Sequence, residues 1–400
     1  MKGQEVVDLA RRVAEESLKP RAAEHDRTGN FPVENFRDLG RSGLLGLYVP
    51  TEYGGLGASH YDFVRAVETL GAACASTAMM YVMHHNQYIM LVEHGSKQQR
   101  DFFLPSIARG ECLVGSATTE PGTGGNADQC VSARRRDGDS FVINATKPVV
   151  SGSRYVDWVL LTTRESEEAP SNALSMMIVP GVKGEGVTPF GVWDCIGMRA
   201  TASSGLKYEG CRVPAWHQIG GDIADLPRAT SMAPVAAAGF SAVWLGIARA
   251  AYEVTVSHLT QRTHQFIRAD RSEVQQTLAQ YDSVQRQVAE MRTKLEAARA
   301  LIQAAARRMD EFKPGPLAHI PIEKMPELQD LLWSARITAS EAAIDVCRVG
   351  LRVCGVSGLR SGFLPLERHM RDALTSQVMA PAEDLTKLLL GRKSLGVPLR

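Results

Sequence analysis

The clearest pattern in the chain is a series of apolar residues, three or four positions apart, between Val274 and Phe312. Side chains at this spacing share one face of an α-helix, because the helix has about 3.6 residues per turn. The face is narrow, which is typical of a helix that packs in a bundle. We therefore expect one helix over 274–312, with apolar positions 274, 278, 281, 284, 288, 291, 295, 298, 302, 305, 309 and 312.

Helical spacing also marks both ends of the chain. Residues 1 to about 112 contain a helical run at 63–70 and a predicted helix over 75–94. From about residue 231 the chain is predicted to be helical to its end, apart from an interruption around 263–272. Its last helices are expected over about 326–352 and 382–396. The segment Val49–Gly57 contains Gly54, Gly55 and Gly57 and is predicted to be a loop.

The pattern changes between residues 113 and about 227. Short β-rich runs alternate there with Gly, Pro and Asp-Gly turn signals. The sequence thus predicts a small antiparallel β domain inserted in a mainly α-helical protein, with domains at 1–112, 113–227 and 228–400. The expected strands include the runs at 130–133, 141–143, 158–163 and 176–179.

One apolar segment, Met232–Ala248, has no charged residue and resembles a membrane span in composition. It is slightly shorter than the ~20 residues that a bilayer requires and is rich in Ala and Gly rather than Leu and Ile. We interpret it as a helix buried inside a large helical protein, with no membrane association.

Composition excludes several classes of protein. The 45 basic and 44 acidic residues leave a net charge of +1, which argues against a nucleic-acid partner. The seven cysteines are scattered and never spaced as CxxC, so neither a disulfide framework nor a zinc site is expected. The charged N-terminus contains no apolar signal-peptide stretch, and we expect a cytoplasmic protein.

Common catalytic motifs are missing from the sequence. It contains no GxGxxG after a strand, no GxxxxGK[ST], no HExxH and no GxSxG. The doublet His84–His85 does not have metal-ligand spacing, because helical neighbours point about 100° apart, and we expect no metal site. Such a doublet on an apolar stretch is typical of satisfied core histidines.

A loop rich in glycine and threonine, Ala117–Asp128, is predicted at the edge of the β domain. Glycine-rich backbone can approach a flat cofactor closely and donate N–H groups to phosphates. Taken alone, this loop is better explained as a plain turn. Its significance depends on the segments that accompany it.

Together these segments resemble the acyl-CoA dehydrogenase superfamily over nearly the whole chain. Five features match the family in order: the VPEEYGG loop, the TEPxAGSD flavin loop, the KxWITNG flavin strand, the end of the β domain and the C-terminal bundle. They correspond to 48–55, 118–125, 147–153, the pair 197–201 and 212–214, and the pair 367–372 and 388–392. The resemblance implies an N-terminal helical domain, a β-barrel-like domain and a C-terminal four-helix bundle.

The same resemblance implies non-covalently bound FAD. Thr118 and Thr119 would contact the flavin, Ser151 would bond near its N5, and Gly124 and Gly125 would lie near the pyrophosphate. Arg262 and Arg352 would reach the ADP half of FAD bound in a neighbouring subunit, because the arginine side chain suits pyrophosphate oxygens. The shared site implies a homodimer or a homotetramer. The remaining implied cofactor residues are Val149, Gly355 and Asp384.

The sequence departs from the family at several of these positions. Val149 replaces the tryptophan that usually covers the flavin. Arg352 and Val356 alter the usual QxxGG turn, and about nine extra residues separate Arg262 from the next helix.

The largest departure concerns the catalytic base. Counting back from 388–392, the position of the family's catalytic glutamate holds Ala380. Some family members carry the base on an earlier helix instead, but the corresponding stretch here, 234–239, contains no acidic residue. A positioned base is worth about 10²–10⁴-fold in rate. Either another base serves, with Glu383 and Asp384 nearby, or the flavin reacts with oxygen, as in the family's oxidase and monooxygenase branches.

For the oxygen-using alternative we hypothesise that His84 is the active-site polar group, since it lies on a helix that lines the substrate pocket in this family. We thus expect an FAD-dependent oxidoreductase acting on an acyl or aryl-acyl thioester of CoA or a carrier protein. A reductase-fed monooxygenase of a free aromatic or heteroatom substrate is the alternative, and a catalytically inactive flavoprotein is disfavoured by the retained flavin loops.

Overall fold

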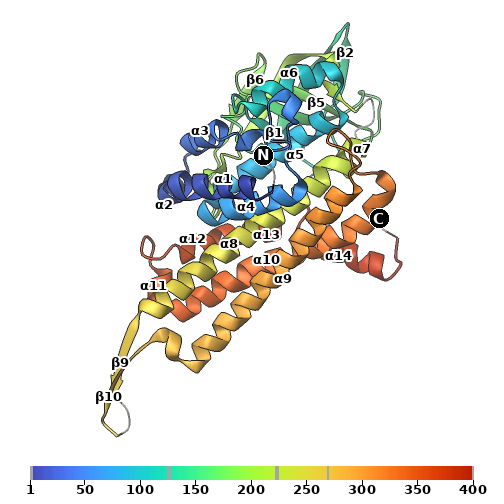
Figure 1. Ribbon diagram of the computed structural model, residues 1–400. Coiled ribbons are helices and arrows are strands. Elements are labelled where there is room, and N and C mark those ends of the chain that lie inside the picture. The colour runs from blue at the N-terminus through green and yellow to red at the C-terminus, as the bar shows by residue number, and fades with distance from the viewer. Residues whose placement is uncertain (1–2, 124–127, 221–224, 268–269, 399–400) are drawn as a thin grey trace.

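A computed structural model describes residues 3–123, 128–220, 225–267 and 270–398 of the chain. It contains helices at both ends of the chain and two β-sheets between them (Figure 1). The mainly α-helical architecture with an inserted β region is therefore confirmed. The described strands form no closed barrel, and they divide into two four-stranded sheets and one hairpin.

The N-terminal region is helical, and the predicted helix over 75–94 is confirmed as α5. Cys74 has an extended backbone and separates α5 from the helix before it, while Ser59 caps that earlier helix with its side chain. The helices of this region are α1 (Gln4–Val13), α2 (Lys19–Thr28), α3 (Val33–Arg41), α4 (His60–Ala73), α5 (Ala75–His94) and α6 (Lys97–Ala108).

The loop predicted over 49–57 is present, with one short 3₁₀ turn at Thr51–Tyr53. Gly54 has a φ of 87°, which favours glycine. A Cβ on Gly55 would lie 2.1 Å from the carbonyl oxygen of Val49. Glycine at these positions lets the loop close tightly against itself.

The central region consists of two sheets with strand orders β1-β4-β5-β8 and β2-β3-β7-β6. The prediction of a purely antiparallel domain is wrong, because β1 pairs with β4 in parallel. The long connection between these two strands permits that pairing. The strands are β1 (Val114–Ala117), β2 (Arg134–Asp137), β3 (Ser140–Lys147), β4 (Trp158–Arg164), β5 (Leu174–Pro180), β6 (Val187–Phe190), β7 (Gly205–Pro214) and β8 (Gln218–Ile219).

The C-terminal region is a bundle built on three long helices, α8, α9 and α10. The prediction over 326–352 corresponds to α10 and the prediction over 382–396 to α14. The helices are α7 (Asp225–Pro227), α8 (Ala233–Gln261), α9 (Asp282–Phe312), α10 (Met325–Cys354), α11 (Val356–Leu359), α12 (Leu366–Ala373), α13 (Thr375–Val378) and α14 (Glu383–Ser394).

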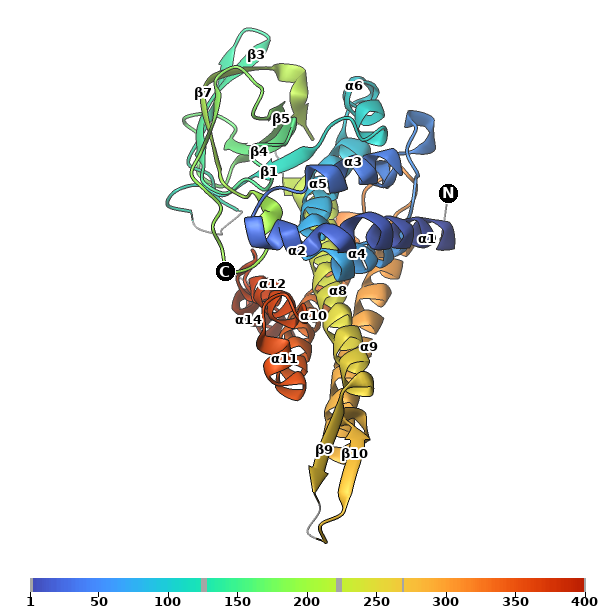
Figure 2. The same cartoon turned by 90° about the vertical axis from the view of Figure 1, so that its left-hand side faces the viewer.

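Residues 233–248 of the apolar segment lie in α8, at the centre of the molecule, and Met232 ends the π-helical turn before it (Figures 1 and 2). The helical span Arg228–Gln261 is long and apolar enough to cross a membrane, but 78% of its most apolar window is buried inside the protein. It contacts α4, α5, α9 and α10. Its apolar surface therefore forms the core around which the helical regions pack.

The prediction of one helix from 274 to 312 is wrong at its N-terminal end. Residues Thr263–Ile267 form β9 and Glu273–Thr277 form β10, an antiparallel hairpin that projects beyond the bundle (Figures 1 and 2). Thr277 then caps a short 3₁₀ turn, and α9 begins only at Asp282. The hydrophobic spacing of 274 and 278 fitted the helix by coincidence, because capping and strand pairing set the boundary.

Candidate flavin site

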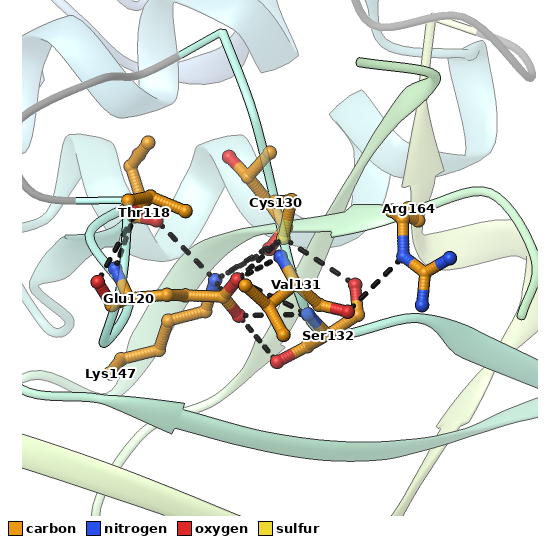
Figure 3. Close-up of polar contacts among 9 residues, drawn as sticks. Thr118, Glu120, Cys130, Val131, Ser132, Lys147 and Arg164 are labelled. Carbon is orange, nitrogen blue, oxygen red and sulfur yellow. Dashed lines mark hydrogen bonds and ion pairs between the residues drawn. The ribbon is translucent and has the colours of Figure 1, made fainter. Parts of the chain in front are cut away.

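A buried ion pair joins the two predicted flavin loops. Glu120 follows β1 in the loop that contains Thr118 and Thr119, and Lys147 is the last residue of β3. Glu120 Oε1 lies 2.9 Å from Lys147 Nζ, and both side chains are almost completely buried (Figure 3). Lys147 also donates a hydrogen bond of 2.7 Å to the carbonyl oxygen of Thr162. The pair therefore fixes the first loop against the strand that leads into the second.

The carboxylate of Glu120 also organises the return of its own loop. It accepts hydrogen bonds from the backbone N–H groups of Val131 and Ser132 and from the Ser132 hydroxyl (Figure 3). The prediction of a strand over 130–133 is wrong for this reason. These N–H groups bind a side chain, and β2 begins only at Arg134.

The charge of Glu120 is strongly stabilised. Burial by itself raises the pKa of the carboxyl, but the Lys147 ammonium and the hydrogen bonds from Ser132 and Val131 outweigh burial. The pKa of Glu120 is lowered to about 2. Burial raises the pKa of the neighbouring Cys130 to about 11, so this thiol is neutral at neutral pH.

The second loop follows β3 directly and lies close to the first. The backbone of Val150 donates to Ser204, and Ser203 donates to the Ser151 hydroxyl over 3.3 Å. A Cβ on Gly115 of β1 would lie 3.2 Å from the carbonyl oxygen of Ser151. The structure therefore brings the loop after β1 and the loop after β3 together at one edge of the β region.

The donors in these loops suit the polar edge of a flavin. Thr118, Thr119 and Ser151 are half-buried, so part of each residue is accessible to a bound molecule. Val149 is 44% exposed. The predicted Gly124 and Gly125 lie outside the described residues. The chemistry of the described donor set fits FAD.

The two arginines predicted for the ADP half, and the predicted cofactor residue Gly355, lie elsewhere in the chain. Arg262 follows α8 and is exposed, Arg352 donates to Gln287 over 2.9 Å, and Gly355 ends α10 with a φ of 57°. All three lie at the end of the bundle near β9, whereas the β region lies at the other end (Figure 1). One chain does not bring the two predicted groups together.

Position 380, which the sequence predicts to correspond to the family's glutamate, lies in a short loop between α13 and α14. Ala380 is exposed there, and Asp384 is exposed in the first turn of α14. Arg336 of α10 is 2% exposed and donates to the carbonyl oxygens of Met379 and Pro381, at 2.8 and 2.7 Å. This arginine holds the main chain on both sides of Ala380.

Burial lowers the pKa of Arg336 to about 10, which leaves it charged at neutral pH. Its guanidinium lies over the ring of Trp244, 4.9 Å from the ring centroid, and near Phe240. The sequence reasoning did not identify Arg336. A signal was available, because this charged residue occupies the otherwise apolar side of α10 between Leu332 and Ala339, both of them buried.

His84 lies inside the protein, with no exposed surface. Its Nδ1 accepts a hydrogen bond from the Val114 N–H at 3.0 Å, and its Nε2 lies 3.2 Å from the Leu45 carbonyl oxygen. Both ring nitrogens are therefore used by the main chain. Burial lowers the pKa of His84 to about 4, so the ring is neutral at neutral pH. These contacts are those of a structural histidine.

Comparison with known proteins agrees with this architecture. Three family descriptions match in order: acyl-CoA dehydrogenase N-terminal domain over residues 2–111, middle domain over 115–211 and C-terminal domain over 238–381. The chain therefore belongs to the acyl-CoA dehydrogenase superfamily, whose members are FAD-binding oxidoreductases.

Relatives cover nearly the entire chain. A short-chain specific acyl-CoA dehydrogenase of Clostridium acetobutylicum is 28% identical over 395 residues, covering 98% of this chain and 97% of the relative. The acryloyl-CoA reductase (NADH) of Anaerotignum propionicum is 28% identical over 388 residues, covering 96% and 92%.

Solved structures share the fold at lower identity. Butyryl-CoA dehydrogenase from Megasphaera elsdenii has a TM-score of 0.86 and 23% identity, and FMN-bound TdsC from Paenibacillus sp. A11-2 has a TM-score of 0.87 and 24% identity. Each comparison covers 98% of this chain and 97% of the other.

Replacing Glu120 by Gln is expected to lower the free energy of unfolding by about 3–5 kcal/mol, because it leaves the buried ammonium of Lys147 unpaired. The native pKa lies below the ordinary 4.5, so the stabilisation is present above pH 4.5 and is lost as pH falls towards about 2. Urea denaturation at several pH values measures both effects. The exposed Glu111, paired with Arg109, is the control: Glu111→Gln should change stability little, and equal losses would contradict the prediction.

His84→Ala is expected to destabilise the fold by about 1–3 kcal/mol, because the Val114 N–H loses its acceptor. The variant should also lose less stability than the native protein as pH falls from 6.5 to about 4, because over this range the unfolded native chain takes up a proton at His84 and the folded chain does not. Thermal or urea unfolding measures both. A variant of unchanged stability that retains FAD but loses turnover would instead assign His84 to the active site.

Proposed function

We propose that this chain is an FAD-dependent oxidoreductase that acts on an acyl or aryl-acyl thioester without the glutamate base used by its family. The observation that supports the proposal is Ala380, which counting back from residues 388–392 assigns to the base position, on a loop whose main chain Arg336 holds in place. With a methyl group at Ala380, the loop offers no carboxylate at this position.

In this proposal the described residues position the cofactor. Thr118, Thr119 and Ser151 contact the flavin, and the Glu120–Lys147 pair sets the positions of their loops. Bound FAD supplies the electron-accepting chemistry. Arg262, Arg352 and Gly355 contact the ADP half in a second subunit, and Asp384 lies on the cofactor side of α14. The enzyme is therefore proposed to be a homodimer or a dimer of such dimers in the cytoplasm.

The alternative bases differ in availability. Glu383 is 9% exposed, and its carboxylate accepts from the Ser340 hydroxyl and from Lys387 Nζ, the latter at 2.6 Å. These bonds occupy the carboxylate and reduce its suitability for taking a substrate proton. Asp384 is exposed and is the more available of the two. The occupied state of Glu383 therefore disfavours this carboxylate as a replacement base and leaves Asp384 as the acidic residue available for that role.

A second candidate function is a reductase-fed monooxygenase acting on a free aromatic or heteroatom substrate. The absence of a carboxylate at position 380 favours this function, because such a reaction removes no proton next to a thioester carbonyl. A protein of the same fold, TdsC of Paenibacillus sp. A11-2, is described as a dibenzothiophene monooxygenase, with a TM-score of 0.85 and 23% identity. Fold similarity alone does not separate the two functions.

Anaerobic mixing of the FAD-loaded protein with acyl-CoA and aryl-acyl-CoA compounds separates the alternatives. Bleaching of the long-wavelength flavin band without oxygen indicates dehydrogenation of the thioester. Bleaching only when a flavin reductase and a reduced nicotinamide are added, followed by oxygen-dependent product formation from a free aromatic substrate, indicates the monooxygenase. Turnover of a thioester that requires oxygen supports the leading proposal.

Ala380→Glu is expected to confer ordinary acyl-CoA dehydrogenation. A correctly placed base is worth about 10²–10⁴-fold in rate, so anaerobic flavin bleaching by butyryl-CoA should accelerate by that order. Ala380→Gln has nearly the same size but no basic oxygen and is the matched control. Equal rates in the two variants would show that position 380 does not face the reacting carbon.

Arg262→Ala is expected to weaken FAD binding about tenfold or more, because a charged hydrogen bond contributes about 1.5–3 kcal/mol. Arg360→Ala removes an equal charge from the same end of the bundle, beside Phe363, and serves as the control. Fluorescence titration of the apoprotein with FAD measures both affinities. Equal weakening in the two variants would indicate a general charge effect and would contradict the assigned contact.

A further inference from the structure

A short chain of hydroxyl groups leads inward from Ser151, the serine proposed to contact the flavin. Ser203 Oγ lies 3.3 Å from Ser151 Oγ and 2.9 Å from Thr201 Oγ1. The Thr201 hydroxyl in turn donates a hydrogen bond of 3.0 Å to the carbonyl oxygen of Met198. Ser203 and Thr201 are both buried, whereas Ser151 is half-buried. Ser203 therefore connects the candidate site to acceptors inside the protein.

The backbone that carries these hydroxyls is strained. Met198 and Ala202 have φ values of 51° and 46°, in the left-handed region that residues other than glycine seldom adopt. Ala202 lies between Thr201 and Ser203, so its conformation determines how the two hydroxyls face each other. The Met198 N–H is held by a hydrogen bond of 2.7 Å to the buried Asp372 of α12. Backbone strain persists only where the surrounding structure enforces it, and it is frequent at functional sites.

Ser203 has a single hydroxyl proton and two neighbouring hydroxyl oxygens that can accept it. When Ser203 donates to Ser151, the proton of Ser151 is free to be donated to a ligand. When Ser203 donates to Thr201, Ser151 can donate to Ser203 and then presents only lone pairs to the ligand. The Thr201 proton is used by the Met198 carbonyl oxygen and does not compete. Rotation of one buried hydroxyl thus converts Ser151 from a hydrogen-bond donor into an acceptor.

The N5 atom of a flavin requires both kinds of partner. In the oxidised ring N5 accepts a hydrogen bond, and uptake of two electrons and one proton turns N5 into an N–H donor. The electrons and the proton come from the reductant, and the serine hydroxyls only rotate, without gaining or losing a proton. Hydrogen bonds to ring nitrogens are one means by which a protein tunes the electronic properties of a cofactor.

We propose that Ser203 is a positioning residue that sets the reduction potential of the bound flavin by turning the Ser151 hydroxyl. Opposite the oxidised flavin, Ser203 donates to Ser151 across the longer contact of 3.3 Å and gives up its bond to Thr201. Opposite the reduced flavin, Ser151 donates to Ser203 and Ser203 donates to Thr201 over 2.9 Å. This proposal rests on the proposed function, because that function places Ser151 against the flavin.

The two arrangements differ in how many hydrogen bonds they contain. In the second arrangement the three hydroxyls and the Met198 carbonyl oxygen form one continuous chain, whereas in the first the chain is interrupted between Ser203 and Thr201. Consecutive hydrogen bonds polarise and strengthen one another. Ser203 therefore stabilises the reduced flavin more than the oxidised flavin.

Ser203→Ala is expected to make two-electron reduction of the bound FAD about tenfold less favourable, because the reduced state loses more hydrogen bonding than the oxidised state. A tenfold change corresponds to a midpoint potential about 30 mV more negative. Reduction of the FAD-loaded protein by xanthine and xanthine oxidase beside a reference dye, followed by absorbance, measures this potential. Ser203→Thr keeps a hydroxyl at this position and should retain the native potential.

Ser204→Ala is the matched control. Ser204 is the next residue and is also buried, but its hydroxyl bonds Ser153 at 2.7 Å rather than Ser151. Its removal should destabilise the fold in thermal unfolding and leave the potential unchanged. Thr201→Val removes the inner acceptor of Ser203 and should shift the potential in the same direction as Ser203→Ala, so it provides the test if the alanine variant does not fold.

The role of Ser203 is overturned if Ser203→Ala and Thr201→Val retain the native potential, if Ser204→Ala shifts it equally, or if Ser203→Thr shifts it as much as Ser203→Ala. Failure of the proposed function is distinguished by the native chain. A native chain that retains no FAD overturns the proposed function and this inference together, whereas retained FAD with unshifted potentials overturns the inference alone.

Discussion

The buried pair of Glu120 and Lys147 is the interaction on which the geometry of the candidate site depends. The carboxylate binds the ammonium and two backbone N–H groups, so it joins β1, β3 and the start of β2 at a single point. Removal of either charge would leave the other uncompensated inside the protein, where it is costly. Loops that must present hydroxyls to a flat ring need such a fixed support, because a loop without one occupies many conformations.

The second constraint is the length of the bundle. The 29 residues of α8 extend about 44 Å, and the flavin loops and Arg262 lie towards opposite ends of this helix. Residues that the family uses for one cofactor are therefore separated within a single chain. Two copies in opposite orientation bring unlike ends together, which explains why a chain of this design is proposed to work as a dimer rather than as a closed monomer.

Sequence patterns predicted the helices better than the irregular segments. The helix α5 was predicted with its observed boundaries, and the burial of α8 was predicted from a charge-free, Ala- and Gly-rich composition. The strand expected at 130–133 and the helix expected at 274–281 failed, because a carboxylate bound the backbone in one case and a hairpin intervened in the other. The flavin loops were located from their resemblance to the family. The contacts of Arg336 depend on tertiary structure, and spacing along the chain does not reveal them.

The contact between Arg336 and its loop has an evolutionary consequence. The guanidinium binds the carbonyl oxygens of Met379 and Pro381, which every residue type possesses, and makes no demand on the side chain between them. The shape of the loop is therefore independent of the residue at position 380. A substitution at position 380 can add or remove a carboxylate while the hydrogen bonds from Arg336 to the main chain persist. A protein with this loop can therefore change the chemistry at that position through one substitution without losing its fold.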